Sequence, residues 1–177
     1  MFRPEWIKFT WDLTKLPSEG NKLGPNLEIR SGQPAEKDKI WTAIERSYQA
    51  EQGWGIILPD RLKELKDLTY KGLEEGFLEV LVLEDGKRIV GASGLVASPE
   101  CPRQLATGVC ITEEYRCRGL GEELLYQSLK FLAGKKLEHA AVVTRSNVAA
   151  HKYLYPKFGS HRDKMEKLPE VEPVKAK

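Results

Sequence analysis

The pattern of residues 77–112 constrains the fold of this chain more than any other feature. Residues 77–83 form a short apolar run, a turn follows at residues 84–87, and the apolar pattern resumes over residues 88–96. A second turn leads to a further candidate strand at residues 104–112. Apolar runs separated by tight-turn residues are typical of hairpins. The segment therefore predicts a three-stranded antiparallel meander.

Helical spacing begins immediately after the meander. Leucines recur one, three or four residues apart, and the pattern ends at Gly134, which indicates an amphipathic helix from Gly119: Leu120, Leu124, Leu125, Leu129 and Leu132. Further segments are expected as a strand at 27–30, helices at 34–51 and between Pro59 and Gly76, a strand at 139–144 and a helix at 147–155. This order predicts an α/β fold of the layered α+β kind, with a mostly antiparallel sheet flanked by helices.

The chain is long enough for one domain with a substantial core. It has 177 residues, of which 41% are hydrophobic. We expect the domain at residues 27–165, after an N-terminal extension and linker at 1–26 and before a polar tail at 166–177 that frays. The aromatic residues of the extension, Trp6 and Trp11, favour a strap packed on the domain over a lid above a substrate.

Charge and cysteine content exclude several classes of protein. The 28 basic and 26 acidic residues leave a net charge of +2, which gives no reason to expect nucleic acid. Cys101, Cys110 and Cys117 form no CxxC pair and the histidines are scattered, so neither a disulfide framework nor a metal site is expected. No apolar stretch suggests a membrane span or a signal peptide. These features predict a cytoplasmic protein with reduced thiols and no membrane partner.

A glycine-containing turn opens the helix that follows the meander. The first N–H groups of a helix have no partner within it and carry partial positive charge, so they attract anions. Gly119 and Gly121 leave room for phosphate oxygens, and Arg116 and Arg118 add positive charge. A turn whose arginines point into solvent would give the same pattern. The ATP motif GxxxxGK[ST] is absent, and Leu124 stands where the dinucleotide motif needs its third glycine.

The segment Arg116-x-x-Gly119-x-Gly121 resembles the Q/R-x-x-G-x-G/A signature of the GNAT superfamily of acyl-CoA N-acyltransferases. The order of elements over residues 27–160 is similar as well. A second landmark of the family, an Asn, an Ala and a Tyr-x-Lys-x-Gly ending, resembles Asn147, Ala150 and Tyr155-Pro156-Lys157-Phe158-Gly159. The stretch between the Asn and the Tyr is one residue longer than usual, and Ser160 replaces a common aromatic residue.

The resemblance implies acetyl-CoA, or another acyl-CoA, as co-substrate without a metal, in a cleft between strands 104–112 and 139–144. The cofactor-binding residues that it implies are Ile111, Arg116, Cys117, Arg118, Gly119, Leu120, Gly121 and Asn147. It assigns the proton for the leaving thiolate to Tyr155. Tyr153 lies about 200° away around a helix, so at most one of the two tyrosines faces the cofactor. We favour Tyr155 because the residues after it match, and Pro156 favours its position at a helix end.

The resemblance also implies direct transfer of an acyl group, above all acetyl, to a primary amine of a small molecule or a protein. Strand 104–112 offers no carboxylate, so the general base that would deprotonate the amine is not assigned. The candidates are a water-mediated base, Glu79 and Glu100. A covalent route through Cys110 or Cys117 is disfavoured, since we find no nearby histidine to activate Cys110. The alternative function is a non-catalytic acyl-CoA sensor or protein-interaction module of the same fold. A homodimer is one candidate for the assembly state.

Overall fold

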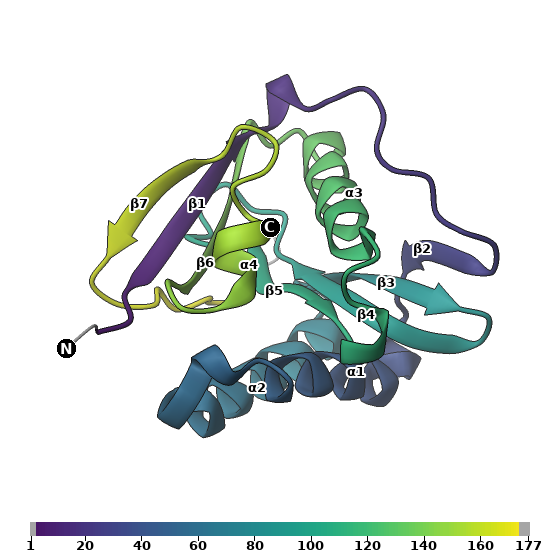
Figure 1. Cartoon of the computed structure of the whole chain (residues 1–177), viewed down its shortest axis with the longest axis horizontal. Coiled ribbons are helices and arrows are strands. Elements are labelled where there is room, and N and C mark those ends of the chain that lie inside the picture. The colour runs from purple at the N-terminus through teal and green to yellow at the C-terminus, as the bar shows by residue number, and fades with distance from the viewer. Residues whose placement is uncertain (1–2, 174–177) are drawn as a thin grey trace.

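Two antiparallel sheets form the centre of the computed structural model, which describes residues 3–173 (Figure 1). The first sheet has the strand order β2-β3-β4-β5, with bounds Leu27–Ser31, Glu79–Asp85, Arg88–Leu95 and Leu105–Ile111. The second has the order β6-β1-β7, with bounds His139–Arg145, Trp6–Asp12 and His161–Met165. The predicted meander is β3-β4-β5, and the expectation of antiparallel strands flanked by helices is confirmed.

Helices cover both faces of the four-stranded sheet. Figure 1 shows α1 (Lys37–Gln49) and α2 (Leu58–Glu75) on one side and α3 (Leu120–Gly134) on the other. Two apolar cores result, one beneath α1 and α2 and one between α3, the sheet and β1. Gly76 ends α2 with φ 81°, a left-handed conformation that glycine adopts without strain. The expected helices therefore form, and their apolar faces create the two cores.

The segment expected as an N-terminal extension contributes a strand instead. β1 is the central strand of its sheet and pairs with β6 on one side and β7 on the other. Ile7, Phe9 and Trp11 point into the core, while the residues between them are half-buried. The Trp11 indole Nε1–H donates a hydrogen bond to the Lys157 carbonyl at 2.7 Å. Trp11 is thus packed, as expected, but inside a sheet rather than as a strap.

Strand β7 was not expected from the sequence. Its residues, HRDKM, are almost all exposed, so they carry no hydrophobic alternation, and backbone pairing with β1 holds the strand. The helix expected at 147–155 is shorter, because α4 spans only Ala149–Tyr153. The domain boundaries at 26/27 and 165/166 remain predictions, and residues 1–2 and 174–177, which belong to the expected extension and tail, lie outside the described residues.

The two sheets separate between β5 and β6. No ladder hydrogen bonds join these strands within residues 3–173, although they lie side by side. β5 is therefore an edge strand that exposes backbone groups toward β6. No helix in the described part of the chain is long and apolar enough to cross a membrane.

Candidate functional site

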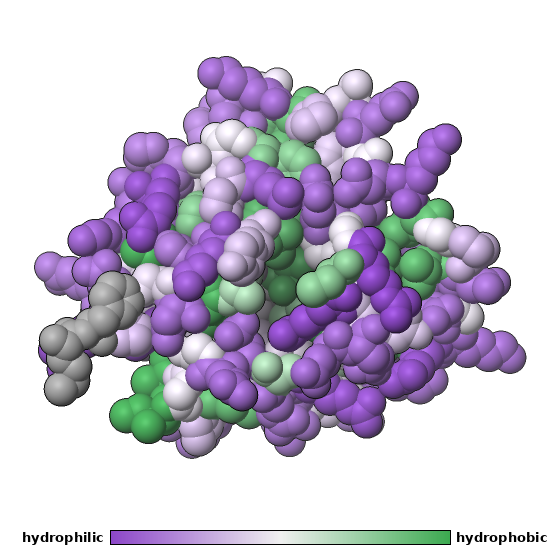
Figure 2. Space-filling view, viewed as in Figure 1, coloured by the Kyte–Doolittle hydropathy of each residue, from purple (hydrophilic) through white to green (hydrophobic). Residues whose placement is uncertain are grey.

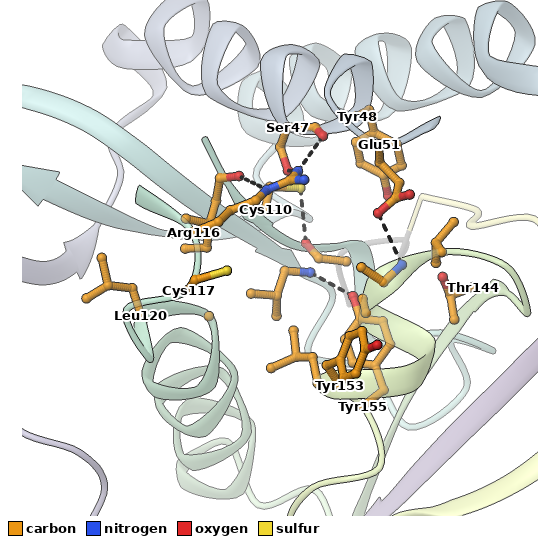
Figure 3. Close-up of a pocket in the computed structure, with 18 of the residues that line it drawn as sticks. Ser47, Tyr48, Glu51, Cys110, Arg116, Cys117, Leu120, Thr144, Tyr153 and Tyr155 are labelled. Carbon is orange, nitrogen blue, oxygen red and sulfur yellow. Dashed lines mark hydrogen bonds between the residues drawn. The ribbon is translucent and has the colours of Figure 1, made fainter. Parts of the chain in front are cut away.

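A cavity of about 340 Å³ opens where β5 and β6 separate. It is lined by β5, β6, the end of α1, the loop before α3 and the α4 segment (Figure 3). Figure 2 shows hydrophobic residues in a recess near the centre of a largely hydrophilic face. Seven of the nine site residues predicted from the sequence line this cavity: Ile111, Arg116, Cys117, Gly119, Leu120, Gly121 and Tyr155.

A bulge in β5 shapes the cavity wall. The pairing of β4 and β5 becomes irregular after Ser93, and Gly108 has φ 73°. The Thr107 hydroxyl accepts a hydrogen bond from the Gly94 N–H at 2.8 Å, and the Tyr48 hydroxyl donates to the Thr107 carbonyl at 2.5 Å. These bonds satisfy groups that the bulge removes from the ladder. They fix a kinked strand beside the cavity.

The loop before α3 presents unpaired backbone donors to the cavity. The N–H groups of residues 117–122 make no hydrogen bond within the described residues. Cys117 and Gly119 have φ 63° and 75°, which turns the chain sharply before the helix begins. A Cβ on Gly121 would lie in ordinary van der Waals contact with Ile111 and Leu154, at 3.8–3.9 Å, so glycine leaves additional room beside these donors. The loop fits an anion such as a pyrophosphate.

The two arginines of the loop have other partners than expected. The Arg116 guanidinium donates to the Ile111 carbonyl at 3.1 Å and to the Ser47 carbonyl at 2.7 Å (Figure 3). It therefore braces the loop against β5 and α1. Arg118 does not line the cavity; it lies over the Tyr115 ring and donates to the Glu114 carbonyl at 2.9 Å. The backbone, rather than these guanidinium groups, supplies the donors that face the cavity.

Tyr155 lies where its hydroxyl can act on a bound group. It follows the end of α4, the position that Pro156 suggested, and its oxygen accepts a hydrogen bond from the Val109 N–H at 3.0 Å. Its own hydroxyl proton has no acceptor among residues 3–173, so it is free for a group in the cavity. Burial raises the pKa of Tyr155, which keeps the hydroxyl protonated at neutral pH. Tyr153 lines the same cavity but is 75% exposed.

The cavity contains a carboxylate that the sequence did not single out. Glu51, beyond the end of α1, is the one acidic residue among the described lining residues, whereas Glu79 and Glu100 are not part of the lining. The Glu51 carboxylate accepts hydrogen bonds from the N–H groups of Gly53 and Ala149, each at 3.1 Å. Asn147 lies outside the lining and donates to the Gly53 carbonyl at 2.7 Å. No local motif marks Glu51, because the fold brings it to the site.

The cysteines differ in their access to the cavity. Cys110 is 1% exposed, and burial raises the pKa of its thiol to about 12, so almost none of it is thiolate at neutral pH. Cys117 is exposed. No group of three or more His, Cys, Asp or Glu that could hold a metal occurs within residues 3–173.

We expect iodoacetamide to modify Cys117 readily in the folded protein and Cys110 only after denaturation, because alkylation needs an accessible thiolate. Mass spectrometry of tryptic peptides after timed exposure at pH 8 measures both rates. Unfolding in urea before the reagent is added serves as the control, since it should make the two rates similar. Rapid labelling of Cys110 without denaturant would contradict its burial and reopen the covalent route.

A comparison with models of known families gives a match to part of the chain. Residues 77–159, which include the loop and Tyr155, match the family model of the acetyltransferase (GNAT) domain. The resemblance noted from the sequence is thus confirmed. A search of curated proteins found no match.

Solved structures share the fold. A functionally unknown conserved protein from Staphylococcus epidermidis has a TM-score of 0.63 at 14% identity, covering 92% of this chain and 59% of its own. A Drosophila protein has a TM-score of 0.60 at 14% identity, and the match covers 92% of this chain and 49% of the Drosophila chain. A GCN5-related N-acetyltransferase from Sphaerobacter thermophilus has a TM-score of 0.55 at 15% identity, covering 96% and 55%. The chain thus spans about half to three fifths of the length of these structures.

Proposed function

We propose that this protein transfers an acetyl group from acetyl-CoA to a primary amine. The chain has the GNAT fold, and its residues 77–159 match the family model of the GNAT acetyltransferase domain. One observation carries the proposal: residues with unpaired N–H groups, among them Cys117, Gly119 and Gly121, line a single cavity with Tyr155 beside an edge strand. The acceptor is a small-molecule or protein amine, and the reaction takes place in the cytoplasm.

The cavity suggests how the co-substrate would be held. The N–H groups of the lining residues Cys117, Gly119, Leu120 and Gly121 would bind the pyrophosphate. The exposed edge of β5 near Ile111 would pair with the extended pantetheine arm. This path leads the thioester toward Gly108 and Tyr155. A Cβ at Gly108 would lie only 2.9 Å from the Tyr155 hydroxyl, so glycine keeps this approach open.

Different residues would have different roles in the acyl transfer. The amine lone pair attacks the thioester carbonyl carbon, the C–S bond breaks, and its electron pair goes to sulfur. Tyr155 would donate its hydroxyl proton to that sulfur, and the Val109 N–H, hydrogen-bonded to the tyrosine oxygen, would stabilise the phenolate left behind. The proton that the attacking nitrogen loses as the amide forms would return to the phenolate through water. Backbone N–H groups of the bulged strand near Ile111 would stabilise the oxygen of the thioester carbonyl.

We expect purified protein to release free thiol from acetyl-CoA only when a primary amine is added. A thiol reagent followed by absorbance measures the release, and mass spectrometry identifies the acetylated amine. Each amine is also tested without enzyme to subtract spontaneous aminolysis. Saturable acetyl-CoA binding with no release for any amine of a broad panel would instead favour the non-catalytic sensor.

A further inference from the structure

Glu51 lies in the cavity in a way that leaves its carboxylate available. Each of its oxygens accepts one backbone N–H, from Gly53 and from Ala149. An ionised carboxylate has about four acceptor sites, so about two have no partner among residues 3–173, and Glu51 is a lining residue of the cavity. Figure 3 shows the Glu51 carboxylate between α1 and the α4 segment, with Thr144 across from it. The two backbone bonds orient the carboxylate without occupying it fully.

The charge balance of the lining makes Glu51 distinctive. The other charged residue among the described lining residues is Arg116, and its guanidinium is hydrogen-bonded to Ser47 and Ile111. An incoming ammonium would therefore meet one carboxylate. A single carboxylate matches an acceptor with one ammonium group better than a polyamine.

Aromatic side chains form the wall beside Glu51. The rings of Tyr48 and Trp54 lie 5.1 Å apart, and each residue is 6% exposed. The Arg61 guanidinium, which lies outside the cavity lining, is 5.6 Å and 5.5 Å from their centroids and forms an ion pair with Glu64. These contacts hold the rings in place. A fixed aromatic wall favours an acceptor with an apolar or aromatic body.

We propose that Glu51 binds the ammonium of an aromatic or apolar monoamine acceptor and takes one of its protons; this rests on the proposed function. The acceptor amine is protonated at neutral pH, with a pKa of about 10. One N–H bond of the ammonium breaks, the proton moves to a Glu51 oxygen, and the electron pair stays on nitrogen as the nucleophile. The total charge is unchanged. An acceptor whose apolar body displaces water from beside the carboxylate would favour the resulting neutral pair over the ion pair.

Calorimetry with a matched pair of ligands tests the proposal. The protein is first saturated with coenzyme A, which carries no acyl group, and then titrated with 2-phenylethylamine or with 2-phenylethanol. We expect the unaltered protein to bind the amine about 10- to 100-fold more tightly than the alcohol. In Glu51→Gln this ratio should fall to about 1, with the affinity for the alcohol changed by less than about twofold. If Glu51 had only a structural role, Glu51→Gln would weaken the binding of both ligands equally.

Asp60→Asn is the matched control. Asp60 is an exposed acidic residue of α2 outside the cavity lining, so its loss changes the net charge equally and should keep the ratio. Thiol release from acetyl-CoA with 2-phenylethylamine gives a second readout. Its kcat/KM should fall by at least about 100-fold in Glu51→Gln, which removes the proton acceptor, and stay within about twofold in Asp60→Asn.

Four results would overturn the proposal. They are a ratio near 1 in the unaltered protein, a ratio kept in Glu51→Gln, tighter binding of spermidine than of 2-phenylethylamine, and no binding of either amine. Absence of coenzyme A binding in the first step would overturn the proposed function instead. The two failures are thus distinguishable.

Discussion

Replacing Gly119 by Glu is expected to weaken acetyl-CoA binding by more than about 100-fold, because like charges brought together cost several kcal/mol. Gly119 lies in the loop whose N–H groups are unpaired, and a Cβ there would meet its nearest neighbour only at 3.8 Å. The new carboxylate therefore has room to enter the path of the pyrophosphate without disturbing the core. Isothermal titration with acetyl-CoA measures the loss, and circular dichroism follows the fold.

Gly76→Glu controls for the backbone strain of this substitution. Gly76 has φ 81°, close to the 75° of Gly119, and lies outside the cavity lining. A Cβ at Gly76 would meet no atom within 4 Å. Both variants should lose about 1–2 kcal/mol of stability, the usual cost of a left-handed residue that bears a side chain. Gly76→Glu alone should keep its affinity for acetyl-CoA. Equal affinities in the two variants would remove the loop from the binding site.

Tyr155→Phe should reduce kcat by at least about 100-fold, the range for loss of a positioned proton donor, and change acetyl-CoA affinity by less than about threefold. The phenyl ring keeps the contacts with Phe9 and Trp11, so only the hydroxyl on the Val109 N–H is lost. Because burial raises the pKa of Tyr155, its proton should remain available from neutral pH to at least the ordinary pKa of tyrosine, about 10. Thiol release and titration give the two quantities.

Tyr153→Phe distinguishes the two tyrosines of the segment. Tyr153 is 75% exposed, and its hydroxyl makes no hydrogen bond among the described residues, so we expect a much smaller loss of kcat than in Tyr155→Phe. If the large loss occurred in Tyr153→Phe, the proton would have to come from that residue. If neither variant lost activity, another group would have to protonate the thiolate.

Local patterns predicted the elements whose residues repeat with a clear period. The leucines of α3, which bury one face of the helix, are an example. The meander was predicted instead from its apolar runs, which are buried on both faces, and from the turns between them. β1 carried a usable signal, because Ile7, Phe9 and Trp11 alternate with residues on the other face, but the linker after it favoured an extension outside the domain. β7 carried none, because its side chains are exposed and only pairing with β1 makes it a strand.

The sequence predicted those site residues that belong to a local family motif. Gly119, Gly121 and Tyr155 line the cavity, as the family motifs implied. Arg118 and Asn147 do not, because nearby carbonyl groups, those of Glu114 and Gly53, hold their side chains elsewhere. Glu51 reaches the cavity through the packing of α1 against β4 and β5, a long-range contact that no short pattern encodes.

Calorimetric titration of the unaltered protein with acetyl-CoA tests the central claim most directly. The loop donors and the open edge of β5 predict saturable binding of one acetyl-CoA per chain. Absence of binding at millimolar acetyl-CoA, with the protein folded, would contradict the assignment of this cavity as an acyl-CoA site and with it the proposed transfer.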